Sequence, residues 1–200
     1  MSLLTIVQYY HAKGGGYDRR PNHAHTEGTT MNQHLDRLEG LAPFLQYPAM
    51  QMIVLCEQKF HRTLMVVSGW RSMQEQLLNF QKGRTFNRDT GEWDVTDLAL
   101  VVTRAKPGAT PHNVIAKTGE RASLALDVIP LLDTGDADWN VGEQFWDGLY
   151  ELAWKVGLDP LGDPIGGYLK MDKGHFEEPG WKLKMNGLGL LLPVSSQVTV

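Results

Sequence analysis

The chain has 200 residues, a formal net charge of −4 and a pI near 6.0, a charge balance that disfavours a nucleic-acid partner. This length can bury a sizeable core, and no apolar run approaches the roughly 18 residues needed to span a bilayer. The single cysteine, Cys56, excludes an internal disulfide and is expected in the core. The first residues lack the features of a signal peptide, which indicates a chain made and folded in a cytoplasm.

The predicted elements begin after a polar, glycine-rich arm. Residues 11–30 are aperiodic and predict a loop or an arm. Residues 63–67 form a short β-prone run, and residues 73–82 predict a helix that ends at Gly83. Before them, apolar side chains recur at helical spacing and predict a helix whose buried face comprises Ala49, Met52, Ile53, Cys56 and Phe60.

The middle of the chain changes character twice. Residues 85–97 are charged and are expected to form a loop, whereas the apolar run 98–102 is a candidate strand. Residues 122–128 alternate, with Leu124 and Leu126 on one side and Asp127 on the other. We therefore expect Asp127 on the strand face opposite the leucines.

The last third adds one helix and one strand. Asn140 and Glu143 have capping-box spacing, and a helical apolar stripe follows and ends at Gly157. His175 and Glu177 share one face if residues 175–177 form a strand. Few strands mixed with helices predict an α+β fold. We expect an N-terminal arm (1–30), one domain (31–182) and a short apolar tail (183–200).

Chemistry-bearing residues are dispersed through the domain. The sequence has no HExxH, GxSxG, Ser-x-x-Lys, P-loop or GxGxxG motif. His112, Asp127 and His175 together are a ligand set that zinc accepts, and Asp172 is a second carboxylate that could act as general base. Taken alone, these positions are more often a hydrogen-bonded structural histidine and a solvated turn aspartate.

The order of four motifs favours the metal-site interpretation of these residues. VVSGWRSMQEQ (66–76), VVTRAKPGATPHN (101–113), LALDV (124–128) and DKGHFE (172–177) follow one another. In that order they resemble the zinc D-alanyl-D-alanine carboxypeptidase and L-alanyl-D-glutamate peptidase family, over about residues 35–182. The resemblance implies a small antiparallel sheet with helices packed on one side and a zinc site at its open face.

The resemblance also implies roles for individual residues. One zinc ion per chain would be held by His112, Asp127 and His175. Asp172 would be the general base, and Arg71 would bind or polarise the substrate carbonyl. Ser68 and Gln76 match the pattern as packing or supporting groups, and Glu177 is either a partner of a zinc ligand or a rival general base.

One departure from the family pattern lies between the first two ligands. His112 and Asp127 are 15 positions apart, farther than in the family, and Ser123 stands where the family has glycine. The simplest account is an insertion of eight residues, 114–121, that loops out between turn and strand. Glu120 is then a rival for the carboxylate ligand, but the alternation around Asp127 favours Asp127.

The implied function is hydrolysis of a stem-peptide bond in bacterial peptidoglycan, with the L-alanyl-D-glutamate bond of phage-type endolysins as first choice. Such an enzyme would act as a monomer and wait in the host cytoplasm, or travel in the virion. One alternative is a D-alanyl-D-alanine carboxypeptidase or dipeptidase. An alternative of another class is a non-catalytic, zinc-stabilised binding or virion structural protein.

Overall fold

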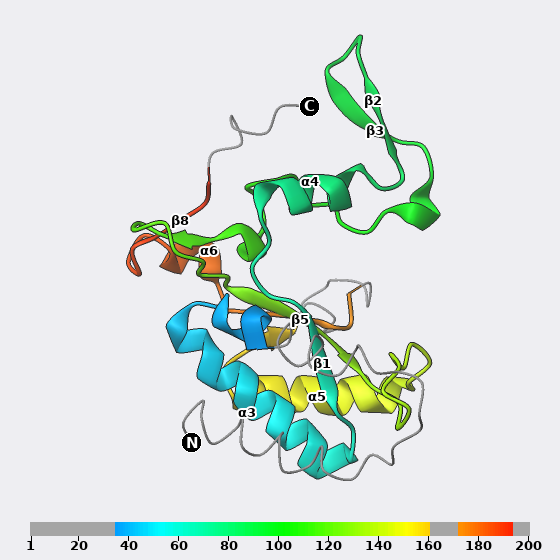
Figure 1. The fold of residues 1–200 in the computed structure, drawn as a ribbon, viewed down its shortest axis with the longest axis vertical. Coiled ribbons are helices and arrows are strands. Elements are labelled where there is room, and N and C mark those ends of the chain that lie inside the picture. Colours follow the sequence, from blue (N-terminus) through cyan, green and yellow to red (C-terminus); the bar gives the residue numbers. More distant parts are fainter. Residues whose placement is uncertain (1–34, 161–171, 194–200) are drawn as a thin grey trace, which may run out of the picture. The chain divides into compact units, whose positions relative to one another are not determined.

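A computed structural model describes residues 35–160 and 172–193. The N-terminal arm expected at residues 1–30 lies outside these residues, as do parts of the loop after Pro160 and of the tail. Figure 1 shows helices and short strands that alternate irregularly along the chain, as expected for an α+β fold. The elements are α3 (Pro43–Phe60), β1 (Leu64–Ser68), α4 (Met73–Gln81), β2 (Arg84–Asn87), β3 (Glu92–Val95), η2 (Leu98–Leu100), η3 (Pro111–Asn113), β4 (Ile115–Ala116), β5 (Ala125–Pro130), α5 (Glu143–Lys155), β6 (Asp159–Pro160), β7 (His175–Glu177), α6 (Trp181–Lys184) and β8 (Leu190–Leu191).

An antiparallel sheet forms the centre of the domain, with strand order β1-β5-β7-β6. Strand β5 is its longest member and is buried along almost its whole length, since Leu126 and Val128 point into the core. The pairing of β1 with β5 shifts between Val66 and Ser68, which is the mark of a β-bulge. The bulge leaves Val66 in the core and brings Ser68 opposite Asp127.

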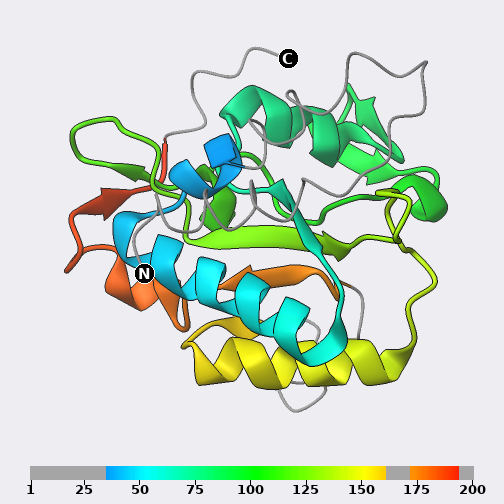
Figure 2. The same ribbon diagram turned by 60° about the horizontal axis from the view of Figure 1, so that its bottom comes forward.

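Helices α3 and α5 lie side by side on one face of this sheet, and α4 lies beyond the other face (Figure 2). Phe60 of α3 stacks at a tilt on Phe145 of α5, with ring centroids 5.3 Å apart, and Lys59 pairs with Glu151 at the surface. Cys56 is fully buried in α3, and burial raises the pKa of its thiol to about 12. The predicted helix and the predicted core cysteine are therefore confirmed.

The segment after α4 differs from its prediction. Residues 85–97, expected as a loop, contain the β2–β3 hairpin, in which Phe86 packs on Trp93. The run 98–102, expected as a strand, begins with the 3-10 helix η2 and is exposed at Leu98 and Leu100. Both predictions are wrong for one reason: a strand forms where a partner strand is available for backbone hydrogen bonds. The charged residues have such a partner, and the apolar run does not.

Helix α5 confirms its predicted stripe but not its predicted start. Its first residue is Glu143 and its N-cap is Gly142, with no side-chain cap, so the capping box predicted from Asn140 is wrong. Asn140 is instead held through its backbone N–H by the Asp138 carboxylate, two residues earlier. The helix ends before Gly157, whose positive φ of 86° gives the left-handed turn expected of a C-terminal glycine.

The insertion and the tail meet in a small two-stranded sheet. Strand β4, within the inserted residues 114–121, pairs antiparallel with β8 near the end of the described chain. The inserted segment turns back on itself at Gly119, where Ala116 and Glu120 are bonded through their backbones. Among the described helices, none is both long and apolar enough to cross a membrane.

Candidate metal centre

The central sheet places three polar side chains in one row. In the register of β1, β5 and β7, Ser68 lies opposite Asp127, and Asp127 lies opposite His175. Glu177 stands two residues beyond His175 and so projects from the same face of β7. Because Leu126 and Val128 fill the core beneath α3 and α5, the row faces the other side of the sheet, as the alternation around Asp127 predicts.

His112 reaches the same place from outside the sheet. It is the middle residue of η3, which begins at Pro111 after the N-cap Thr110, and it is buried. Its Nδ1 lies 2.6 Å from the carbonyl oxygen of Gly69. A carbonyl oxygen can only accept, so Nδ1 carries the proton and Nε2 keeps its lone pair.

The three predicted ligands converge. His112 Nε2, Asp127 Oδ1 and His175 Nδ1 form a group that could hold a metal ion. The two ring nitrogens are 3.3 Å apart, and Asp127 Oδ1 is 3.3 Å from His112 Nε2 and 2.8 Å from His175 Nδ1. Two imidazole nitrogens and one carboxylate oxygen are the donor set of a catalytic zinc site with an open fourth position.

The orientation of His175 suits a cation at this point. Its Nε2 lies 3.2 Å from the carboxylate of Glu177, which accepts the Nε2 proton and turns Nδ1 toward the other two ligands. Hydrogen bonds of this kind to the far nitrogen are how metal-binding histidines are usually oriented. With both rings so held, three electron-rich atoms face one another, and a metal ion or a proton is needed between them.

The pKa values also indicate that a positive charge is needed among these three side chains. Burial lowers the pKa of His112, so this ring is neutral. Burial opposes ionisation of Asp127, but the neighbouring His112 and His175 outweigh it and hold its pKa well below the usual range. Burial also lowers the pKa of His175, yet its hydrogen bonds to Asp127 and Glu177 prevail and raise that pKa to about 10. Without a metal, His175 therefore carries the balancing proton at neutral pH.

Arg71 lies on the second oxygen of the central carboxylate. Its Nη2 pairs with Asp127 Oδ2, and its Nε donates to Ser68 Oγ at 2.7 Å. Asp127 is thereby held with Oδ1 toward the histidines and Oδ2 toward the guanidinium. A guanidinium has five N–H donors, so these two bonds do not exhaust it.

Asp172 is within electrostatic range of the whole centre. Its side chain is exposed, and its pKa is raised by partial loss of hydration and by the negative charge of Asp127. The positive charges of His175 and Arg71 act on it in the opposite direction. A carboxylate whose pKa is moved toward neutrality is better suited to accept and release a proton than an ordinary one.

Two other sequence candidates lie away from the ligand group. Gln76 is fully buried and donates through Nε2 to the Ala105 carbonyl at 2.9 Å, so it holds the chain that leads into the turn before His112. Glu120 is exposed, accepts a hydrogen bond from Thr118 that lowers its pKa, and is not a member of the ligand group. The insertion thus leaves Asp127 as the carboxylate beside the two histidines.

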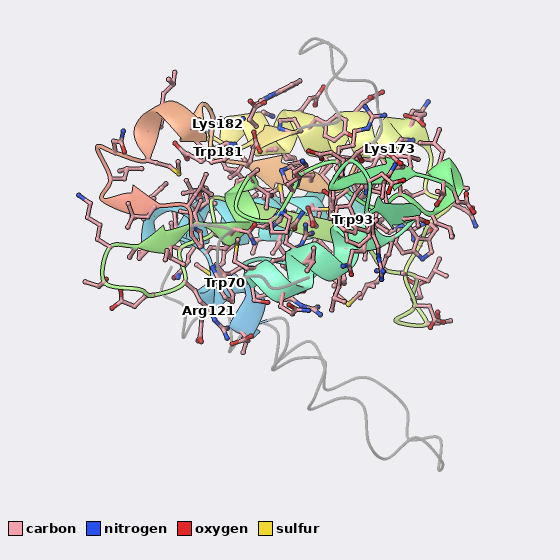
Figure 3. The ribbon with its side chains drawn as sticks, turned by 90° about the horizontal axis from the view of Figure 1, so that it is seen from above. Trp70, Trp93, Arg121, Lys173, Trp181 and Lys182 are labelled. Atoms are coloured by element: carbon pink, nitrogen blue, oxygen red, sulfur yellow. The ribbon has the colours of Figure 1, made fainter. Side chains whose placement is uncertain are left out.

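The insertion also contacts the loop after β1, which carries Arg71. Figure 3 shows Arg121, at its end, close to Trp70. The guanidinium carbon lies 5.2 Å from the centre of the indole ring, and the same side chain pairs with Asp36. In the sequence, Trp70 stands between Gly69, whose carbonyl orients His112, and Arg71, so the insertion contacts the loop that carries both residues.

Two residues of the centre went unnoticed in the sequence. Gly69 supplies the carbonyl that orients His112, and an added Cβ would lie 2.2 Å from the Arg37 carbonyl oxygen, so only glycine fits. Asn113 is fully buried and joins two loops. The sequence motifs could have revealed both residues, because Gly69 follows Ser68 in SGWRS and Asn113 follows His112 in PHN.

No protein-family model matches the chain, and no curated protein matches it in sequence. Solved structures with similar folds include the L-Ala D-Glu endopeptidase ChiX of Serratia marcescens, at 15% identity and a TM-score of 0.41, covering 74% of this chain and 87% of that one. A mutant of the vancomycin-resistance D,D-pentapeptidase VanY from a VanB-type cassette, in complex with Zn(II), has 19% identity and a TM-score of 0.42, covering 78% and 79%. VanYB in complex with D-alanine-D-alanine has 18% identity and a TM-score of 0.41, covering 89% and 88%. Likenesses of this size leave the function to be argued from the site and the motifs.

Proposed function

We propose that the chain is a zinc-dependent peptidase that hydrolyses a stem-peptide bond of bacterial peptidoglycan, with the L-alanyl-D-glutamate bond as the favoured target and host lysis as the favoured role. The observation that carries this proposal is the convergence of His112 Nε2, Asp127 Oδ1 and His175 Nδ1, each oriented by its own partner. The order of the four sequence motifs independently supports the same family of peptidases.

Zinc would supply Lewis-acid chemistry, by polarising a carbonyl and lowering the pKa of a water molecule. His112, Asp127 and His175 would hold the ion. Glu177 and the Gly69 carbonyl would fix the two rings, and Arg71 would fix the carboxylate. Because every ligand is held by a partner, the centre would be preorganised before substrate arrives.

Asp172 is the proposed general base. It lies close enough to feel the charges of Asp127, His175 and Arg71, and it is not itself one of the three ligands. It would take a proton from the attacking water and return it to the leaving amine. Glu177 is the weaker candidate for this task, because its carboxylate already accepts the Nε2 proton of His175.

Arg71 is the proposed cation for the substrate carbonyl. The guanidinium is fixed by Asp127 and Ser68 at the edge of the ligand group. A donor held in place in this way stabilises negative charge that develops on a carbonyl oxygen without having to reorganise. Arginine suits the task because it remains charged at any working pH.

The test is mass spectrometry of purified peptidoglycan digested by the zinc-loaded wild type and by Asp172→Asn. New amino termini at D-glutamate, produced by the wild type alone, are the expected result. Release of free D-alanine would move the protein to the carboxypeptidase alternative. Equal absence of products from both proteins, with zinc bound in each, would favour a non-catalytic zinc protein instead.

A further inference from the structure

Asn113 ties together two loops that the central sheet does not connect. Its side chain is fully buried, directly after His112 in η3. The amide Nδ2 donates to the Arg71 carbonyl at 2.8 Å, and the amide Oδ1 accepts from the Gly108 N–H at 2.9 Å. Both ends of the buried amide are therefore satisfied, as a buried polar group requires.

The loop that carries Arg71 is bonded to η3 in the reverse direction as well. The Arg71 N–H donates to the His112 carbonyl at 2.9 Å. The N–H and the carbonyl of Arg71 are thus bonded to two consecutive residues of η3, His112 and Asn113. The His112 ring is bonded to Gly69, which lies two positions before Arg71. No described strand pairing includes His112. The Pro111 and Val114 carbonyls accept from the N–H groups of Leu124 and Ala122, which tie η3 to the chain before β5, and the bonds to Gly69, Arg71 and Asn113 tie it to the loop after β1.

The amide oxygen of Asn113 accepts from Gly108, a residue whose backbone conformation and surroundings favour glycine. Gly108 has a φ of +75°, and an added Cβ would lie 2.8 Å from the Pro193 carbonyl oxygen. The N–H of Gly108 therefore points at Asn113 from a turn that other residues would strain. A carboxylate in place of the amide would keep this bond and lose the donation to Arg71.

We propose that Asn113 is a positioning residue that sets the distance between the His112 imidazole and Arg71. Because Arg71 pairs with Asp127, Asn113 also sets the distance between His112 and Asp127. The proposal rests on the proposed function, since it assumes that the three ligands bind zinc. It assigns to a residue that touches neither metal nor substrate a measurable share of zinc affinity and turnover.

The test compares Asn113→Asp with the wild type. Zinc affinity is measured by competition with a chelating dye, the ligand geometry by the visible absorption of the Co(II)-loaded protein, and stability by melting of the metal-free protein. We expect zinc affinity to fall by about 10- to 100-fold, the usual cost of losing a group that supports a metal ligand. The Co(II) bands should shift, and kcat should fall while KM changes little.

Leu149→Ala is the matched control. Leu149 is fully buried in α5, on the opposite side of the sheet, so its truncation weakens the fold without touching η3. It should lower the melting temperature and leave zinc affinity and the Co(II) spectrum unchanged. This separates a loss of positioning from a general loss of stability.

The proposal is overturned if Asn113→Asp folds and binds zinc as tightly as the wild type with an unchanged Co(II) spectrum. If that variant does not fold, Asn113→Ser is measured in its place, because serine is neutral but too short to span both partners. The same two outcomes then decide. A wild type that binds no zinc would instead refute the proposed function, which is a distinguishable failure.

Discussion

Strands β5 and β7 hold Asp127 and His175 through the register of the sheet, whereas His112 and Arg71 stand on η3 and on the loop after β1. In the sheet, strand pairing fixes both residues: Asp127 lies between Ser68 of β1 and His175 of β7, and His175 pairs with β5. In the loops, position depends on individual bonds: His112 donates to the Gly69 carbonyl, Asn113 donates to the Arg71 carbonyl, and the Pro111 carbonyl accepts from the Leu124 N–H. The proposed metal centre is therefore built from two halves: a rigid half held by strand pairing, and a loop half that single substitutions can loosen.

The rigid half also depends on close packing beneath it. An added Cβ at Gly174 would lie 2.3 Å from the Val128 carbonyl oxygen, and the Gly174 carbonyl accepts from the Val128 N–H. The chain therefore enters β7 tight against β5 just before His175. The loop half has its counterpart in Gly69, so each half is anchored by a glycine where two backbones approach.

The largest effect is expected from the rigid half. His175→Ala removes one of the two ring nitrogens of the ligand group, and it leaves Asp127 Oδ1 without its hydrogen-bond partner at 2.8 Å. We expect loss of stoichiometric zinc and of all hydrolysis. Elemental analysis of the purified variant checks this, and one zinc per chain in that variant would break the assignment.

Asp172→Asn should separate chemistry from binding. The side chain is not one of the converging ligands, so zinc content should remain that of the wild type. The rate should fall by roughly two to four orders of magnitude, the typical contribution of general acid–base catalysis. Turnover of a synthetic stem peptide by the zinc-loaded variant measures it, and a near-normal rate would transfer the role to Glu177.

Glu177→Gln should weaken the rigid half without dismantling it. The amide is isosteric, but it holds the Nε2 proton of His175 less strongly than the carboxylate at 3.2 Å. We expect zinc affinity to fall by about 10-fold or more, within the range for outer groups of metal sites. Chelator competition provides the number, and Glu120→Gln, on the exposed turn of the insertion, is the control that should change nothing.

The smallest effect, per step, is the dependence of zinc affinity on pH. The metal-free pKa of His175 is about 10, so the ring is protonated through the neutral range, while His112 is already neutral there. Zinc must displace that proton, and its apparent affinity should rise about tenfold for each pH unit between about 6.5 and 8. Calorimetry in buffers of different ionisation enthalpy should find about one proton released per zinc. A slope near zero would show that His175 is neutral in the metal-free protein.

Much of the centre was predictable because local patterns encode it. The alternation around Asp127 and the spacing of His175 and Glu177 fix which strand face each occupies, since successive side chains of a strand point to opposite sides. The helical spacing in α3 and the stripe of α5 likewise follow from one face being buried. The α+β class follows from these elements, and the structure confirms it.

Other features were decided only by contacts between distant parts of the chain. The hairpin at residues 84–95 and the exposed run at 98–102 depended on whether a partner strand was present, which composition does not reveal. Strand β4 of the insertion pairs with β8, near the end of the described chain, through Ala116 and Leu190. Whether Glu120 or Asp127 lies beside the histidines was likewise settled by how that segment folds back.

The sequence by itself determined the donor types, their order and the strand face of Asp127, because these depend on residue identity and on a period of two. Only the tertiary structure brought His112 Nε2 within 3.3 Å of His175 Nδ1, across 63 residues of chain. It did so through individual hydrogen bonds, such as those from His112 Nδ1 to the Gly69 carbonyl and from Asn113 Nδ2 to the Arg71 carbonyl, and no sequence period describes such bonds. The chemistry of the site is thus written locally, while its geometry is set by contacts over long range.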